Sequence, residues 1–142
     1  MNKKVIRILI AVCLILATTT STAFAETRTF TRTVRYYILN NGHYDYIVKK
    51  NRTGKKGELV TAKVNYAFVS GRKKQTIHIT SVDTTITGDN ASKFYCETKR
   101  FSPRNMHLIL ENDDREIGYI TVRFTDTARF KQSYHNYLGP RV

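Results

Sequence analysis

The alternating pattern of residues 106–124 constrains the fold of this chain more than any other sequence feature does. Apolar and polar residues alternate through 106–111 and again through 119–124, and a polar turn of sequence Asn-Asp-Asp-Arg lies between the two runs. A period of two with one apolar face is typical of paired antiparallel strands that are buried on one side and wet on the other. An isolated hairpin is at best marginally stable in water, so this pair requires a second layer against its apolar face.

Further alternating runs predict the strands of that layer, at residues 27–39, 44–49, 60–68, 75–86 and 93–99. Asn- and Gly-rich turns separate them, and no long amphipathic helix or internal repeat interrupts them. About seven short strands predict a single antiparallel β-sandwich at 26–133, immunoglobulin-like in general plan, with a small β-barrel as the alternative. Residues 125–133 fit a short helix, a turn or coil, and 134–142 are predicted to be a C-terminal tail.

The alternation slips once, inside the run at 75–86. Ile77 and Ile79 share one parity, whereas Val82, Thr84 and Ile86 share the other. A β-bulge or a break near Ser81 would explain the slip.

The first 25 residues have the pattern of a secretory signal peptide. Lys3, Lys4 and Arg7 precede an apolar run that is short for a membrane span, and 23–25 read Ala-Phe-Ala, as signal peptidase requires. We therefore expect cleavage before Glu26, export to the extracellular side of a bacterial cell envelope, and no transmembrane helix in the mature chain. A lipid-modified Cys13 and an uncleaved anchor are the alternatives.

The mature chain remains strongly basic. Three of the 24 basic residues and none of the 11 acidic ones precede Glu26, so 21 basic residues face 11 acidic ones and the net charge is +10. Cys96 is the single cysteine that remains, so no intramolecular disulfide is expected. Its position favours a small apolar residue facing the core, and a reactive thiol is the alternative.

Catalytic and metal-binding patterns find little support. A cysteine nucleophile needs a base beside it, and nothing in the sequence places a histidine near Cys96. The four histidines lack the spacing of a metal site, and Asp113 and Asp114 occupy a turn where such residues are common. We therefore expect neither an enzyme nor a cofactor.

Charge is the remaining functional signal. If seven strands alternate in direction, the loops at 40–43, 71–74 and 100–105 meet at one end, and those at 50–57, 88–92 and 112–115 meet at the other. The first end then gathers six basic residues and no acidic one: Arg72, Lys73, Lys74, Lys99, Arg100 and Arg104. We predict that they form an anion-binding surface, although a basic surface that only maintains solubility fits equally.

The expected partner is an extracellular polyanion of the cell wall, an acidic glycan, or an acidic protein surface. Nucleic acid is disfavoured, because tyrosines in a β-rich chain more often reflect strand packing than base stacking. The alternative function is a secreted interaction or inhibitor module that pairs with a partner through an exposed strand edge.

Overall fold

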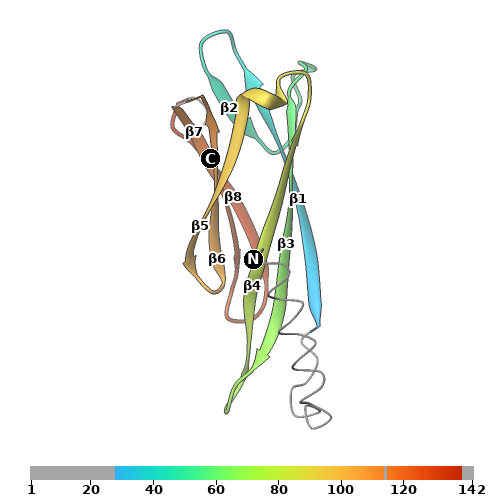
Figure 1. Ribbon diagram of the computed structural model, residues 1–142, viewed down its shortest axis with the longest axis vertical. Coiled ribbons are helices and arrows are strands. Elements are labelled where there is room, and N and C mark those ends of the chain that lie inside the picture. Colours follow the sequence, from blue (N-terminus) through green and yellow to red (C-terminus); the bar gives the residue numbers. More distant parts are fainter. Residues whose placement is uncertain (1–27, 114, 139–142) are drawn as a thin grey trace, which may run out of the picture.

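Two antiparallel four-stranded sheets pack face to face in the computed structural model, which describes residues 28–113 and 115–138 (Figure 1). The predicted β-sandwich is confirmed. The predicted signal peptide and the last four residues of the predicted tail lie outside the described ranges. Within those ranges, no helix is long and apolar enough to span a membrane.

The first sheet has the strand order β2-β1-β3-β4 and the second the order β5-β6-β7-β8. Their bounds are β1 Thr29–Asn40, β2 Asp45–Val48, β3 Glu58–Ser70 and β4 Gln75–Thr87, then β5 Phe94–Ser102, β6 Asn105–Asn112, β7 Arg115–Phe124 and β8 Phe130–Asn136. A short 3₁₀ turn, η2 (Ala91–Lys93), precedes β5. Each sheet is built from strands that are consecutive in sequence, whereas immunoglobulin sheets exchange strands. Among the described residues, no strand pairing joins the two sheets, so the barrel alternative is wrong.

Strand β8 was not predicted. It pairs with β7 from Phe124 opposite Phe130 to Gly118 opposite Asn136, where the sequence left a helix, turn or coil open and placed a tail from residue 134. Its inward-facing positions hold aromatic and amide side chains instead of aliphatic ones, so its alternation is hard to read. Residues 134–136 therefore belong to the second sheet.

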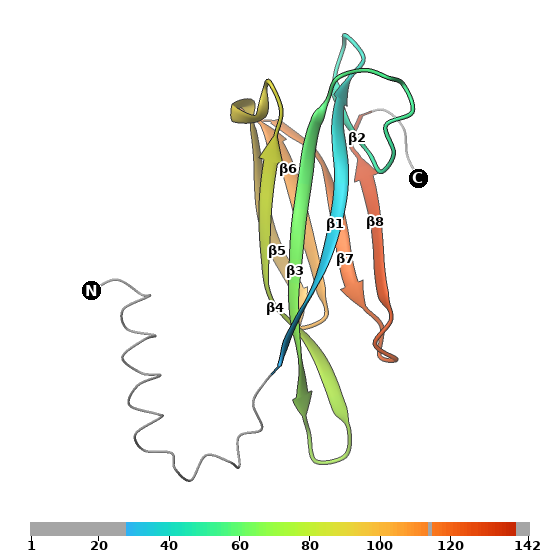
Figure 2. The same ribbon diagram turned by 90° about the vertical axis from the view of Figure 1, so that its right-hand side faces the viewer.

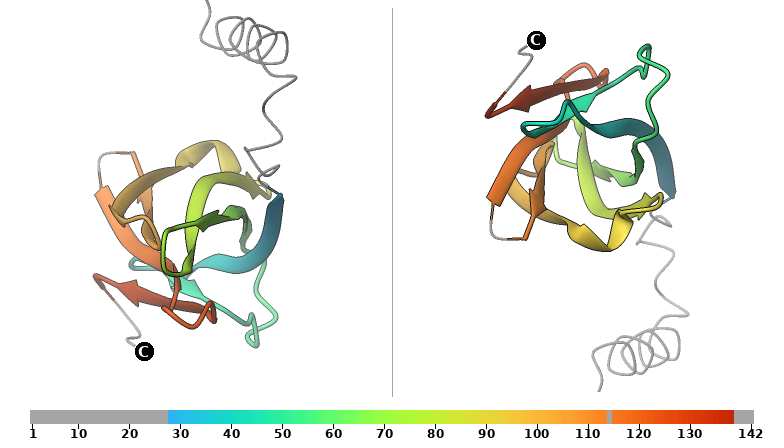
Figure 3. Two further views of the ribbon diagram at one scale, coloured as in Figure 1. Left: turned by 90° about the horizontal axis from the view of Figure 1, so that it is seen from below. Right: turned by 90° about the horizontal axis from the view of Figure 1, so that it is seen from above.

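The core lies between the two sheets, which face each other when viewed along the long axis (Figure 3). Alternate residues of seven strands form one buried cluster, joined by Phe130 and Tyr134 of β8 at its border. Ten of its side chains are at most 1% exposed: Tyr36, Ile38, Ile47, Val60, Ala62, Val64, Leu108, Leu110, Ile120 and Val122. Burial of this apolar area is the main stabilising contribution to a fold of this kind.

The predicted slip near Ser81 is a β-bulge, and β4 continues through it. Asn65 pairs with Ser81 and Tyr66 with Ile79, which leaves Thr80 as the extra residue. The Thr80 hydroxyl donates to the Asn65 carbonyl over 3.1 Å. Because the strand does not reverse here, the loops before and after β4 stay at opposite ends of the sandwich.

Strand β2 was predicted to cross the molecule and so to place residues 50–57 at the end away from the turn at 40–43, but it is too short to do so. Both β2 and β3 run antiparallel to β1, and β3 begins opposite Ile38, so residues 49–57 return to the end where β1 finishes. Gly57 makes this return possible, because a side chain there would overlap the Ile38 carbonyl. The turn at 40–43 therefore lies with residues 49–57, 88–93 and 112–115. We call this end of the sandwich the opposite end, because it lies away from the hairpin arm described next.

The other side, which we call the arm end, holds the β3–β4 turn, the β5–β6 turn and the β7–β8 loop (Figure 2). Strands β3 and β4 continue beyond the second sheet here and form a projecting hairpin arm (Figure 1). The first half of β1 is an edge, because β2 pairs only with residues 37–40. Arg32, which interrupts the apolar side of β1, lies there with its guanidinium 5.9 Å from the Phe130 ring centroid.

Candidate functional site

All six basic residues predicted to bind anions lie at the arm end. Arg72, Lys73 and Lys74 form the tip of the hairpin arm, and Lys99, Arg100 and Arg104 lie at the end of β5 and in the β5–β6 turn. Five of them are exposed and Arg104 is half-buried. The structure thus brings the two basic segments to the same end, and their role in anion binding stays a prediction.

The six residues form two groups instead of one cluster. The Ile79 N–H donates to the Pro103 carbonyl over 2.7 Å, so the β5–β6 turn lies beside Ile79 and not beside the arm tip. At the rise of an antiparallel strand, Lys74 lies about 17 Å farther along the arm. This separation exceeds the Debye length of about 8 Å at physiological salt, so the two groups attract small anions independently. A polymer long enough to reach both would gain from both.

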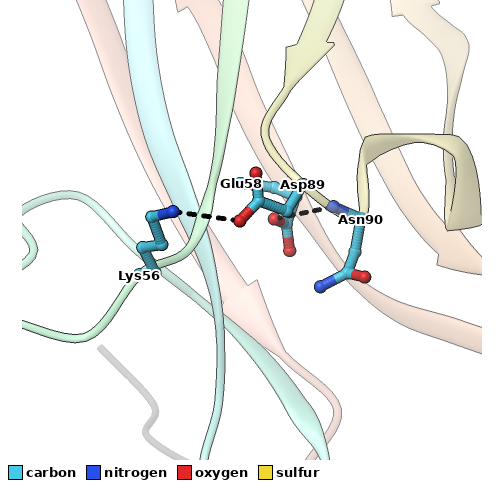
Figure 4. A network of polar contacts seen from close by, with 4 residues as sticks. All are labelled: Lys56, Glu58, Asp89 and Asn90. Carbon is cyan, nitrogen blue, oxygen red and sulfur yellow. Dashed lines mark hydrogen bonds and ion pairs between the residues drawn. The ribbon is translucent and has the colours of Figure 1, made fainter.

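None of the six cations has an ion-pair partner among the described residues. The ion pair that the described part of the chain does contain lies at the opposite end, where Lys56 Nζ is 3.1 Å from Asp89 Oδ2 (Figure 4). Beside it, the Asn90 N–H donates to the buried carboxylate of Glu58 over 3.4 Å. The opposite end therefore mixes and partly neutralises its charges, whereas the six cations of the arm end have no such partner among the described residues.

A row of five rings crosses the outer face of the second sheet. We call it the aromatic row, and it consists of Phe101, His107, Tyr119, His135 and Tyr137. The Phe101 and His107 centroids are 4.2 Å apart, and those of His107 and Tyr119 are 4.3 Å apart with planes 8° from parallel. Phe101 and Tyr137 are 52% and 40% exposed, so both ends of the row are open to solvent.

Strand register produces the row. Tyr119 lies opposite Ile109 and His135, and His107 lies opposite Lys99, so the rings step diagonally across four strands. Phe101 is the extra residue of a bulge, because Arg100 pairs with Met106 and Ser102 with Asn105. A bulge re-aims a side chain, and this one brings Phe101 against His107.

The margins of the aromatic row differ in charge. Toward the arm end, Arg123 and Lys131 lie directly opposite each other, and both are exposed. We call this pair the basic corner. With Thr121, Gln132 and Ser133 they line a hollow of about 160 Å³. Toward the opposite end, β5, β6 and β7 carry an acidic margin of Glu97, Glu111 and Glu116.

Two rings of the row have shifted pKa values. Burial, and then the nearby Lys99 ammonium, lower the pKa of His107 from 6.5, so its imidazole is neutral at neutral pH. Burial, and then the Glu116 carboxylate, raise the pKa of Tyr137 from 10.0. Both rings are therefore uncharged hydrogen-bonding groups at neutral pH.

Cys96 is packed against the border of the core, which agrees with its prediction as a small apolar residue. Burial raises the pKa of its thiol to about 11, although the Thr84 side chain opposes the shift. At neutral pH the thiol is protonated, and protonation removes the nucleophilic form. Among the described residues, no group of three or more His, Cys, Asp and Glu side chains is arranged to hold a metal ion.

A larger hollow of about 450 Å³ lies at the opposite end. Its walls carry both signs of charge: Lys55, Lys56 and Lys93 against Asp45, Glu58 and Asp113. It has no excess charge that would select a ligand, so the arm end and the adjoining outer face are the stronger candidate site.

Sequence reasoning found part of this surface. The alternation at 106–124 already placed His107 and Tyr119 on the wet face of one hairpin. It missed Phe101, because the predicted strand ended at Lys99 whereas β5 continues to Ser102, and it missed His135 and Tyr137, because β8 was not recognised. The cationic pair Arg123 and Lys131 was missed for the same reason.

The chain was compared with family models, curated proteins and solved structures, and none of the three comparisons gave a match. The fold defines the class, an all-β sandwich, and a proposal about function has to be argued from the surface chemistry.

Proposed function

We propose that this protein is an exported, non-enzymatic binding module that holds an anionic polymer of the cell envelope at its arm end. The observation that carries the proposal is the presence of two exposed basic groups, at 72–74 and at 99–104, on one end of the sandwich without an ion-pair partner among the described residues. Unpaired cations on one face create a positive potential that attracts polyanions and raises their association rate.

The spacing of the two groups favours a polymer over a small anion. A single phosphate or carboxylate can reach one group, and each exposed charge contact contributes only about 0.2–1 kcal/mol. A chain spanning about 17 Å engages both groups, so the second contact forms at a high effective concentration. Affinity should therefore rise steeply with ligand length until both groups are occupied.

Retention on purified anionic cell-wall polymer tests the proposal. Replacing Arg72, Lys73 and Lys74 by glutamine should lower retention about tenfold, because about three exposed contacts are lost. The matched control replaces Lys49, Lys50 and Arg52, which are exposed at the opposite end, and removes the same charge. Equal losses in both variants would mean that net charge alone acts, and unchanged retention in the arm variant would refute the proposal.

The hairpin arm favours a second candidate function, pairing of a partner chain along a strand edge. Strand β4 is the edge of the first sheet, and the arm that contains its first residues projects beyond the second sheet (Figure 1). Exposed strand edges offer backbone hydrogen-bonding groups to an added strand.

Salt distinguishes the two candidates. Binding through exposed charges weakens steeply with ionic strength, because the Debye length falls to about 3 Å at 1 M salt. Binding through backbone hydrogen bonds and apolar contacts persists under these conditions. Complete release from the partner at high salt would exclude the strand-edge candidate.

A further inference from the structure

We infer that the polymer is a chain of acidic sugars, and that it lies across the outer face of the second sheet with a carboxylate in the hollow of the basic corner. This inference rests on the proposed function and names its ligand class. Its evidence is independent of the six predicted cations, because it comes from Arg123, Lys131 and the aromatic row.

The basic corner is built as an anion site. Arg123 and Lys131 are direct cross-strand partners, and like charges in this position repel each other. Neither has an ion-pair partner among the described residues. An anion between them offsets the repulsion, and a guanidinium can bind a carboxylate through two hydrogen bonds.

The size and lining of the hollow fit one acidic substituent. Its volume is about 160 Å³, and Thr121 and Ser133, which also face each other across β7 and β8, add two hydroxyl groups. Hydroxyls donate to a carboxylate and also accept from sugar hydroxyls. The hollow is open at the outer face, so a substituent can enter while the rest of its polymer stays on the sheet.

The aromatic row disfavours nucleic acid as the ligand. Base stacking requires open ring faces. The His107 and Tyr119 planes are 8° from parallel at 4.3 Å, so each ring covers a face of the other. Their edges, which carry N–H, N and O–H groups, are the parts that remain for a ligand, and such groups match sugar hydroxyls.

The acidic margin narrows the ligand class further. Carboxylates accept hydrogen bonds from hydroxyl groups and repel anionic groups, phosphates and carboxylates alike. A ligand that crosses this face from the basic corner to Glu97, Glu111 and Glu116 must therefore present acid groups at one side and hydroxyl groups at the other. An acidic sugar carries both on one ring, whereas poly(glycerol phosphate) offers no ring to contact Phe101 or Tyr137.

Calorimetric titration of the purified protein with three probes tests the inference: a uronic acid oligosaccharide, a poly(glycerol phosphate) oligomer and a single-stranded oligonucleotide of equal charge. The uronic acid oligosaccharide should bind most tightly. Arg123→Gln with Lys131→Gln should weaken its binding roughly fivefold, as expected for about two exposed charge contacts. The control Lys49→Gln with Lys50→Gln, at the opposite end, should leave it within about twofold.

A second variant, Phe101→Ser, tests the aromatic row at its most exposed ring and should weaken binding of the uronic acid oligosaccharide while leaving that of poly(glycerol phosphate) unchanged. Equal affinity for the three probes together with no effect of the Arg123 and Lys131 changes would overturn the inference and leave the proposed function standing. Tighter binding of the oligonucleotide would overturn it as well. Absence of binding to every probe would refute both.

Discussion

The side-chain amide of Asn136 pairs with both backbone polar groups of Ile47. The Ile47 N–H donates to Asn136 Oδ1 over 2.6 Å, and Asn136 Nδ2 donates to the Ile47 carbonyl over 2.9 Å. Asn136 ends β8 in the second sheet and Ile47 lies in β2, an edge strand of the first sheet. Both residues are 0% exposed, so the amide closes one side of the sandwich by imitating a neighbouring strand.

This contact predicts that Asn136→Ala is strongly destabilising. The substitution removes the side-chain partner of a buried N–H and a buried carbonyl, and unpaired buried groups cost about 1–3 kcal/mol each. We expect the free energy of unfolding to fall by about 2–4 kcal/mol in urea titrations. Ser133→Ala, at an exposed position of the same strand, is the control and should change it by less than about 0.5 kcal/mol. A loss of similar size in both variants would contradict the prediction.

The raised pKa of the Tyr36 phenol predicts a loss of stability at alkaline pH. Burial, and then the neighbouring Tyr134, raise its pKa from 10.0 to about 12. Between these values the unfolded chain releases the phenol proton and the folded chain keeps it, so stability falls as pH rises through this window. The Tyr36 hydroxyl also donates to Gln132 over 2.9 Å.

The variant Tyr36→Phe separates these two contributions. At neutral pH it should be less stable by about 1 kcal/mol, because the hydrogen bond to Gln132 is lost. Above pH 10 its stability should fall less steeply than that of the unmodified protein, because the titrating group is gone. Thermal unfolding followed from pH 8 to 11 measures both effects. Parallel curves for the two proteins would show that Tyr36 does not titrate in this way.

The position of His107 in the aromatic row, together with its lowered pKa, predicts a pH dependence of polymer binding. Its pKa is lowered from 6.5, so it is neutral at pH 7 and acquires positive charge only on acidification. The groups around it are Lys99 and Phe101 of β5 and Tyr119 and Thr121 of β7. We therefore expect the affinity for a polymer whose carboxylates stay ionised in this range to rise as pH falls from 7 to 5. Part of this rise should be absent in His107→Gln.

The same shift has the reverse sign for stability. Because the folded chain binds this proton less readily than the unfolded chain, stability declines as pH falls below 6.5. His107→Gln should reduce this decline, and the exposed His43→Gln serves as the control. A binding curve that is unchanged by His107→Gln would remove this residue from the site.

Local sequence patterns were sufficient to predict much of the fold. The alternation at 106–124 is the β6–β7 hairpin, and the slip between Ile79 and Val82 is the bulge at Thr80. Patterns of this kind can be read from sequence because side-chain parity in a strand depends only on neighbouring residues. Strand β8 was missed because its inward positions include Gln132 and Asn136, whose burial depends on partners in the other sheet.

The candidate site depended on contacts that local patterns do not contain. Arg72 and Arg100 lie at one end of the sandwich because strands β4 and β5 each cross the molecule once, whereas the turn at 40–43 joined the other end because β2 is too short to cross. The aromatic row likewise requires a bulge at Phe101 and the register of four strands.

By itself, the sequence determined a basic, strand-rich chain with one buried face to each strand. Charge follows from composition, and period-two alternation is a property of neighbouring residues. Only the tertiary structure decided which loops share an end, which rings touch and where Arg123 meets Lys131. The physical reason is that these outcomes are set by strand register and by the direction of each connection, and both depend on pairing between residues far apart in the chain.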